Sequence, residues 1–309
     1  METLFEPWVL ITLCAAFLQN IRSVLQKHLR GALSTTGATF VRFGFGVPVA
    51  FALLFLLLHT QGKALPAMSA SFAVWVVVAA LAQILAQALL IAVFSYRNFV
   101  VGSAYSRTEP VQAALFGLVF LGEHASSGVL VAIAIAMAGV LMMSVAKSRV
   151  TPVSLLTGLT SRGAGMGLLS GAFFGLAAVG YRGASLALEG PAGEPGYTIQ
   201  AAVTLCVAIT LQSVVLAIWM AWRSPGEFAA IAKAWKPSAL VGVVGALASF
   251  GWFAAMTLQQ ASVVKTLAQV EILFTMATSW FIFRERITAA ELAGVALVVA
   301  GILALLWLG

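Results

Sequence analysis

Ten apolar segments, each long enough to cross a bilayer as a helix, follow one another along this chain. A membrane-spanning helix needs about 20 predominantly apolar residues, and this chain of 309 residues is 61% hydrophobic and only 9% charged. The runs are continuously apolar rather than alternating, which favours helices over the strands of a barrel. The sequence therefore predicts an all-α polytopic membrane protein with ten transmembrane helices, at approximately residues 8–29, 36–58, 71–94, 99–121, 126–146, 163–184, 197–222, 238–258, 262–283 and 287–308.

The charge balance is basic, with 17 Lys and Arg against 10 acidic residues, all of them Glu, and a net charge of +7. In a soluble protein this balance would suggest a nucleic-acid partner. Here most of the basic residues fall in short gaps between apolar segments, where membrane topology explains them. We therefore expect a lipid bilayer and no nucleic acid as partners of the chain.

The residues that usually carry enzyme chemistry do not cluster in this sequence. Cys14 and Cys206 lie in separate apolar segments and suit packing, while His28, His59 and His124 are scattered near segment ends. No metal-ligand spacing, catalytic triad or phosphate-binding loop can be assembled from them. We expect no enzyme activity, no metal and no cofactor.

The two halves of the chain contain related sequences. The stretch "TEPVQAALFGLVFLGEHASSGVLVAIAIAMAG" aligns without a gap with "VEILFTMATSWFIFRERITAAELAGVALVVAG", which lies 162 residues later. We predict a first five-helix repeat over residues 1–150 and a second over residues 151–309. Because five is odd, the two repeats would cross the membrane in opposite senses, as in many secondary transporters. Matched pairs in the alignment are Glu109 with Glu271, Glu123 with Glu285, and Gly139 with Gly301.

The segments "ATFVRFGFGVPVAFALLFLL" and "EPVQAALFGLVFLGE", the glycine-bearing fifth segment and the paired "LGE" and "RE" endings resemble the drug/metabolite transporter superfamily, in its EamA-type branch. The resemblance covers essentially the whole chain. It implies a ten-helix carrier of small polar metabolites, often an exporter, in a bacterial inner membrane or an organelle membrane. Two positions depart from the internal repeat, because Ile272 stands opposite Pro110 and Lys265 stands opposite Ser103.

The membrane orientation stays open. Lys and Arg are concentrated in the gaps after the first, third, fifth, seventh and ninth segments, so the positive-inside rule predicts that both termini lie outside. The family resemblance implies that both lie inside.

Charged residues also lie inside the predicted helices, where a central charge costs about 2.5–3.5 kcal/mol on insertion scales. Arg42 and Lys265 are close enough to segment ends for their side chains to reach the interface. Glu109 and Glu271 are about ten residues, or roughly 15 Å, into their segments, and their side chains are too short to do so. We expect both glutamates to face one central cavity between the repeats. The alternative is a pair of protonated or salt-bridged structural carboxyls.

A proline directly follows Glu109 in the stretch "YSRTEP". Pro110 has no N–H to donate and biases Glu109 away from helical dihedral angles, which predicts a kink or an opening of the fourth helix. We expect Arg107 and Glu109 to line this break. The alternative is a kink that serves shape alone.

Polar amides in two other segments are further candidates for the site. Asn20 and Arg22 lie in the polar run "LQNIRSVLQ", and Gln83 and Gln87 share one helix face because they are four residues apart. Lipid offers amides no hydrogen-bond partners, so these side chains should face the interior of the bundle. Contact with solute and bonding between helices are both open for them.

Two motifs point to structural roles. Gly163, Gly167, Gly171 and Gly175 form a stripe with four-residue spacing, which favours close packing against another helix of the same chain, with dimerisation as the alternative. The sequence "TAAE" at residues 288–291 fits a capping box at the start of the last helix.

These observations predict a secondary transporter that works by alternating access. The substrate-binding candidates are Arg107, Glu109, Glu271, Lys265, Asn20, Arg22, Gln83 and Gln87, and the coupling candidates are Glu109 and Glu271, with protons as the candidate coupling ion. The basic excess among the charges inside the membrane favours an anionic or zwitterionic solute, such as an amino acid or a phosphorylated metabolite. An exporter of cationic amines or drugs is the first alternative, and a receptor that moves no solute is the second.

Overall fold

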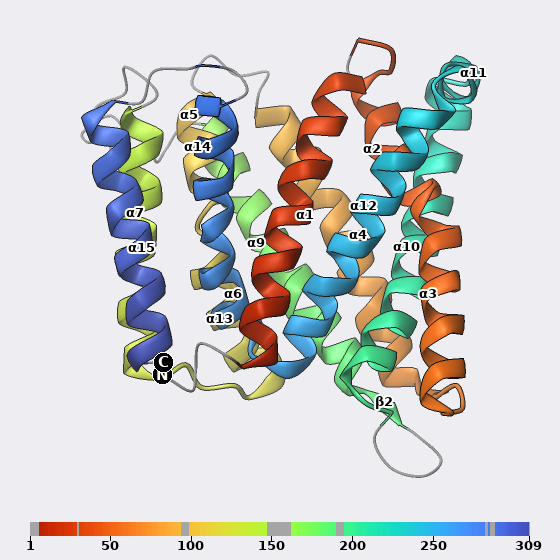
Figure 1. Ribbon diagram of the computed structural model, residues 1–309, viewed down its shortest axis with the longest axis horizontal. Helices are drawn as coiled ribbons and strands as arrows, with labels where there is room; N and C mark the ends of the chain where they lie inside the picture. Colours follow the sequence, from red (N-terminus) through yellow and green to blue (C-terminus); the bar gives the residue numbers. More distant parts are fainter. Residues whose placement is uncertain are drawn as a thin grey trace. The chain divides into compact units, whose positions relative to one another are not determined.

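The computed structural model describes residues 6–29, 31–93, 99–146, 162–189, 195–281, 284 and 288–308. Their secondary structure is almost entirely helical (Figure 1), as the sequence predicts. Two strands of two residues each, β1 (Ala67–Met68) and β2 (Leu188–Glu189), pair in antiparallel fashion. The predicted boundary between the repeats, near residue 150, and Glu285 lie outside the described residues.

Eight of the predicted segments are long helices. Each is long and apolar enough to cross a membrane, and each lies within a few residues of its predicted limits. These helices are α1 (Pro7–Leu29), α2 with α3 (Thr35–Gly44 and Gly46–Gln61), α4 (Ala70–Val93), α7 (Ser127–Ala146), α9 (Arg162–Leu186), α10 (Tyr197–Arg223), α12 (Trp235–Leu258) and α15 (Ala289–Leu308).

The second segment is divided only at Phe45, which keeps helical dihedral angles, whereas the fourth and ninth segments have longer interruptions. The fourth consists of α5 (Phe99–Ser106) and α6 (Glu109–Leu121), and the ninth of α13 (Ala261–Leu267), the 3-10 turn η3 (Ala268–Val270) and α14 (Glu271–Phe281). The break at Pro110 confirms the prediction. The break in the ninth segment was not predicted. Ile272 stands where the first repeat has Pro110 and, unlike proline, keeps its backbone N–H, so the sequence gives no sign of the 3-10 turn that forms this break.

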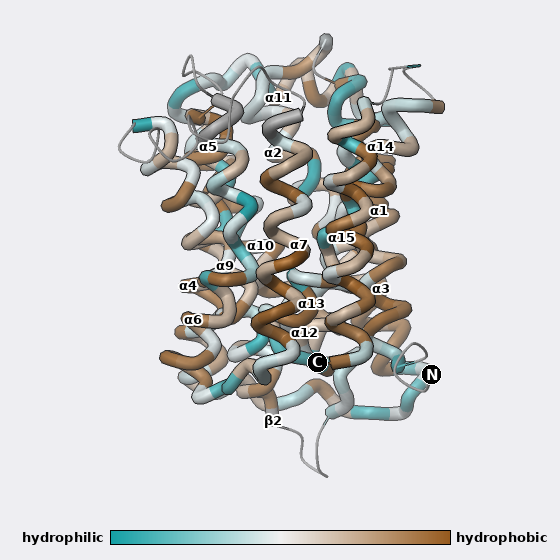
Figure 2. The backbone as a smooth tube through the Cα atoms, turned by 90° about the vertical axis from the view of Figure 1, so that its left-hand side faces the viewer, coloured by the Kyte–Doolittle hydropathy of each residue, from teal (hydrophilic) through white to brown (hydrophobic). Residues whose placement is uncertain are grey.

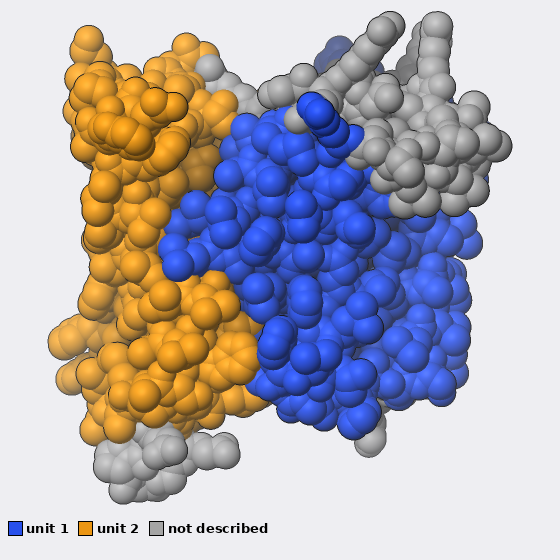
Figure 3. All heavy atoms as spheres, turned by 180° about the vertical axis from the view of Figure 1, so that it is seen from behind, with its two compact units in different colours: residues 1–9, 81–179, 259–309 blue, residues 10–80, 180–258 orange. Residues whose placement is uncertain are grey.

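The chain divides into two compact units, coloured separately in Figure 3. Unit 1 contains residues 1–9, 81–179 and 259–309, and unit 2 contains residues 10–80 and 180–258. Each unit therefore takes residues from both halves of the sequence, and the division falls within α4 and within α9. The predicted sequence repeats, which meet at residue 150, do not coincide with these units.

In unit 1, two helices at matched positions of the repeat, α7 and α15, pack against each other (Figure 1). Helix α6 lies beside α13, which is the first part of the other interrupted segment. The contact between α7 and α15 is close at the matched glycines, because a Cβ on Gly139 would lie 2.6 Å from the carbonyl oxygen of Gly294, and a Cβ on Gly301 would lie 2.6 Å from the backbone nitrogen of Ala136. Only glycine allows the two backbones to approach this closely.

The glycine stripe of α9 has the predicted packing role. A Cβ on Gly167 would overlap the carbonyl oxygen of Gly102 in α5, and one on Gly171 would lie 2.9 Å from the carbonyl oxygen of Ser106. Gly175 approaches the backbone nitrogen of Ala113 in α6 in the same way, at 3.0 Å. The stripe thus lets α9 pack directly on both halves of the interrupted fourth segment.

The capping box at the start of α15 is also confirmed. The backbone nitrogen of Thr288 donates to Oε2 of Glu291 at 2.8 Å, and the nitrogen of Glu291 donates to Oγ1 of Thr288 at 3.3 Å. Two otherwise unpaired donors at the helix start are satisfied reciprocally.

Unit 2 is built around α10, which packs against α2, α3 and α12. A short amphipathic helix that the sequence analysis did not identify, α11 (Gly226–Lys233), connects α10 to α12. Its Ile231 is only 5% exposed and joins an apolar cluster with Leu29, Leu33, Val41, Met220 and Val241.

Many large apolar side chains are exposed on the helices, among them Phe55 at 73% and Val119 at 70%. Hydrophobic residues cover most of each helix in Figure 2, and hydrophilic residues gather mainly where helices end. Such a surface suits lipid rather than water.

Candidate functional site

The break in the fourth segment is held by local hydrogen bonds around Pro110. The backbone nitrogen of Thr108 donates to the carbonyl oxygen of Tyr105 at 3.1 Å, and the Thr108 hydroxyl donates to the same oxygen at 2.7 Å. The side-chain amide of Gln112 in turn donates to the Thr108 hydroxyl at 2.6 Å. The carbonyl oxygen of Tyr105, in the last turn of α5, thus receives two hydrogen bonds from Thr108, and these bonds hold the turn between α5 and α6.

The break in the ninth segment contains a buried amide side chain, that of Gln269. The Gln269 amide nitrogen donates to the carbonyl oxygen of Lys265 at 3.5 Å. Gln269 is only 7% exposed, and its amide oxygen has no hydrogen-bond partner among the residues that the structure describes. Buried polar atoms are normally paired, so this oxygen is a candidate acceptor for a ligand or a water molecule.

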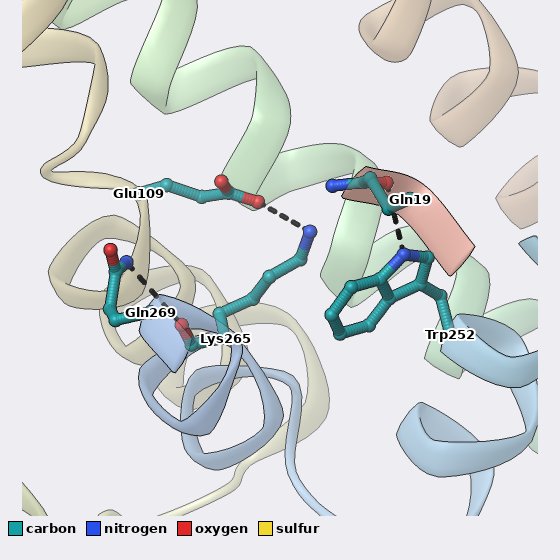
Figure 4. Close-up of polar contacts among 5 residues, drawn as sticks. All are labelled: Gln19, Glu109, Trp252, Lys265 and Gln269. Carbon is teal, nitrogen blue, oxygen red and sulfur yellow. Dashed lines mark hydrogen bonds and ion pairs between the residues drawn. The ribbon is translucent and has the colours of Figure 1, made fainter. Parts of the chain in front are cut away.

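An ion pair joins the two interrupted segments within unit 1. Nζ of Lys265 in α13 lies 2.8 Å from Oε1 of Glu109, the first residue of α6 (Figure 4). Their side chains are only 22% and 20% exposed. Charges that are largely removed from solvent interact more strongly than surface pairs do. The sequence analysis named both residues but did not predict that they pair.

Arg107 does not take part in this ion pair. It lies in the turn between α5 and α6 and is exposed, whereas Glu109 turns to Lys265. Arg107 thus lies in the turn and Glu109 directly follows it, and both stay candidate site residues on sequence grounds.

Glu271 occupies the position in α14 that Glu109 occupies in α6. Both are the first residue of the second half-helix of an interrupted segment, and both are partly buried. The carbonyl oxygen of Glu271 accepts a hydrogen bond from the Thr275 hydroxyl at 2.8 Å. The sequence alignment of the two glutamates therefore corresponds to a shared local structure.

Two arginines come together in unit 2, beside Gly245 of α12. Arg22 is 8% exposed and Arg42 is partly buried. A Cβ on Gly245 would lie 3.2 Å from Cγ of Arg42 and 3.4 Å from Cδ of Arg22. The glycine leaves room for both aliphatic stems, so α1 and α2 each bring one guanidinium into the interior of this unit.

Amide side chains inside the helices have several roles. In unit 2, Gln19 accepts a hydrogen bond from the indole nitrogen of Trp252 at 3.1 Å (Figure 4). Gln212, which the sequence analysis did not name, donates to the Tyr181 hydroxyl at 3.0 Å. These bonds tie helices together. Asn20 in unit 2, and Gln83 and Gln87 in unit 1, are partly buried.

Arg182 was missed as a charged residue inside a predicted segment. It lies in α9, and its Nη1 atom donates to the carbonyl oxygens of Met256 at 2.7 Å and Thr257 at 3.2 Å. These are among the last carbonyls of α12, which have no partner within their own helix. The role of Arg182 is structural. The sequence did contain a signal for it, because Arg182 is a charged residue within the predicted helix at residues 163–184.

Comparisons with known proteins place these features in a family. The EamA-like transporter family matches residues 6–145 and again residues 161–307. No curated protein matches the sequence. A solved structure described only as "Crystal structure of protein" is similar, with a TM-score of 0.69 and 15% identity, over 97% of this chain and 95% of its own.

At 15% identity, the likeness to that structure shows the fold alone. The family matches cover most of the chain and extend over both predicted halves, and the described helices include eight that are able to cross a membrane. The chain therefore belongs to the EamA-like transporter family and is an integral multi-pass membrane protein.

Proposed function

We propose that the protein is a secondary transporter, an exporter or exchanger, of a small anionic or zwitterionic metabolite such as an amino acid or a phosphorylated metabolite. The observation that carries the proposal is the ion pair between Lys265 and Glu109, at 2.8 Å, which joins two interrupted membrane segments. The proposal includes ten membrane crossings in two inverted repeats, alternating access and a location in the cell membrane, or in an organelle membrane if the cell is eukaryotic.

The interruptions favour a transport role because irregular backbone at membrane depth is tolerated only against protein or a water-filled cavity. Discontinuous helices are also where secondary transporters commonly bind their solutes. Here both interruptions occur at matched repeat positions, and both second half-helices begin with glutamate, Glu109 and Glu271.

The ion pair offers one group for each charge of a zwitterion. A solute carboxylate or phosphate competes with Glu109 for Lys265, while a solute ammonium competes with Lys265 for Glu109. A zwitterion can replace both interactions at once, and so leaves neither charge without a partner. The buried amide oxygen of Gln269 adds a neutral acceptor close to Lys265.

The charges of unit 2 also favour an anionic group on the solute. Arg22 and Arg42 reach the interior of the unit beside Gly245, and guanidinium groups bind carboxylate and phosphate in a planar, two-pronged geometry. Glu109 and Glu271 are the groups proposed to exchange protons during transport, because they are the carboxyls at the matched starts of the two second half-helices.

Export of cationic amines is the second candidate, and the matched glutamates favour it. It requires Glu109 and Glu271 for binding and makes Lys265 a competitor of the solute. A receptor that moves no solute is the weaker alternative.

Counterflow in proteoliposomes tests these possibilities. Purified protein is reconstituted with a neutral amino acid, a phosphorylated metabolite or an organic amine inside, and entry of the labelled solute is measured. We expect amino acid or phosphorylated solute to exchange, and Lys265→Gln and Glu271→Gln each to lower the rate. Lys63→Gln is the control, because Lys63 is exposed and donates to the carbonyl oxygen of Pro195 in a loop.

Each alternative has its own outcome. Exchange of amines alone, with Arg107→Ala and Lys265→Gln active and Glu271→Gln inactive, would establish the amine exporter. Absence of counterflow with every solute class, from protein that unfolds cooperatively, would contradict the transporter.

A further inference from the structure

The segment that joins α10 to α12 has a surface of tryptophan and basic side chains that the transport mechanism does not use. Its exposed indoles are those of Trp219, Trp222 and Trp235, at 48%, 73% and 56% exposure. Exposed basic residues lie among them. We call this set the Trp–basic cluster, and its members are Trp219, Trp222, Arg223, Lys233, Trp235 and Lys236.

Two of the three cations of this cluster, Arg223 and Lys236, lie over indole rings. Cζ of Arg223 lies 5.7 Å from the ring centre of Trp219 and 5.4 Å from that of Trp222. Nζ of Lys236 lies 5.8 Å from the ring of Trp235. These cation–π contacts orient the basic groups without neutralising their charge.

The acid within this segment, Glu227, is directed elsewhere. Its Oε2 atom accepts a hydrogen bond from the backbone nitrogen of Ser34 at 3.2 Å, at the start of α2. Residues 219–236 contain three basic residues and this one glutamate. The cluster therefore keeps an excess of positive charge at its surface.

The short helix α11 fixes the segment to the body of unit 2. Ile231 is buried with Met220 and Val241, and Phe228 packs edge to face on Phe40 with 6.1 Å between ring centres. With this face occupied, the basic groups of Arg223, Lys233 and Lys236 are left exposed.

The cluster extends from the end of α10, at Arg223, to the start of α12, at Trp235, and both helices are able to cross a membrane. Tryptophan prefers the headgroup level of a bilayer, and Lys and Arg there attract anionic lipid. We propose that the Trp–basic cluster binds the headgroup phosphate of anionic phospholipids, with the indoles at the headgroup level and the three cations around the phosphate.

The test is lipid binding to the full chain in neutral detergent, measured by native mass spectrometry during titration with phosphatidylglycerol or with phosphatidylcholine. We expect a preference for phosphatidylglycerol. Lys236→Gln should weaken its binding about fivefold, and combined Arg223→Gln, Lys233→Gln and Lys236→Gln should remove the preference. Lys236→Arg should keep it.

Arg162→Gln is the matched control, because it removes one exposed positive charge from the start of α9, a residue of unit 1 that is not a member of the cluster. An equal loss in this control, or a preference that survives in the triple variant, would overturn the proposal. The unfolding temperature in phosphatidylcholine alone shows whether the variants are folded. If the triple variant is unfolded, the comparison of the two single variants decides: Lys236→Gln should weaken phosphatidylglycerol binding and Lys236→Arg should not.

Discussion

The two units treat polar groups inside the membrane segments in different ways. Unit 1 contains both interrupted segments, and there an ion pair joins Glu109 to Lys265. In unit 2 the interior amides bond to partners on other helices, as Gln212 does with Tyr181 and Gln19 with Trp252. The membrane-length stretches of α10 and α12 are 56% and 61% buried, but those of α1 and of α2 with α3, also in unit 2, are 33% and 28% buried, so the amide bonds rather than burial distinguish this unit. We interpret unit 1 as the part whose paired charges can exchange their partner for a solute. We interpret unit 2 as the part whose helices are held together by fixed hydrogen bonds between side chains.

The largest effect should come from exchanging the charges of the ion pair. We expect Glu109→Lys or Lys265→Glu alone to lower the free energy of unfolding by about 2 kcal/mol, since each places two like charges together. The double exchange should recover most of that loss. Counterflow should stay about 100-fold below wild type in all three variants, because the solute meets reversed charges. Full counterflow in the double exchange would show that the pair is purely structural.

The second prediction concerns the close packing of unit 1. Gly167→Ala should lower the free energy of unfolding by about 2 kcal/mol, because its Cβ overlaps the backbone of Gly102. Gly165→Ala on the same helix has open space around the new methyl group and should be neutral or stabilising by up to about 1 kcal/mol. Denaturant unfolding of both variants measures the difference. Equal stability would mean that α5 and α9 can separate without loss.

The third prediction concerns the bonded interior of unit 2. Gln212→Leu removes the donor to the Tyr181 hydroxyl and should destabilise the protein by about 1–2 kcal/mol, with counterflow per folded molecule unchanged. Tyr181→Phe in the same background should add little, because both partners are then apolar. The comparison between the units fails if Gln212→Leu abolishes counterflow while its stability is normal.

The smallest expected effect lies at the start of α15. Thr288→Ala removes the hydroxyl that accepts the Glu291 backbone N–H and should lower the free energy of unfolding by about 1 kcal/mol. Thr39→Ala is the control, because the Thr39 hydroxyl donates to the carbonyl oxygen of Thr35 within its own helix. Equal losses in thermal unfolding would rule out a specific contribution from the cap.

The helices were predictable where a local signal existed. The limits of α1, α10 and α15 follow from apolar runs of membrane length, and the opening at Glu109 follows from Pro110. The opening before Glu271 was not predicted, because no residue there forbids a helix and the 3-10 turn depends on its surroundings. Helix α11 was missed because eight residues between two membrane segments give too short a periodic signal.

The candidate site was only partly predictable. Glu109 and Glu271 were identified because charges deep in apolar segments are costly and rare, and Lys265 because it is a charge within a predicted segment, although close to the segment's start. Their pairing was not, because residues 109 and 265 are distant in sequence and the alignment of the repeats places Ser103, not an acid or a base, opposite Lys265. Arg182 was overlooked because its partners are backbone carbonyls, which carry no sequence signal.

The sequence by itself determined that this chain enters a membrane as helices, where those helices lie, and that its two halves are related, because apolar length and repeat spacing are local properties. Tertiary structure decided which charge meets which and which glycines touch a neighbouring backbone. It also set the division into units, which crosses the repeat boundary. These contacts and this division depend on distances between segments that are far apart in the chain. Composition and periodicity carry no information about such distances.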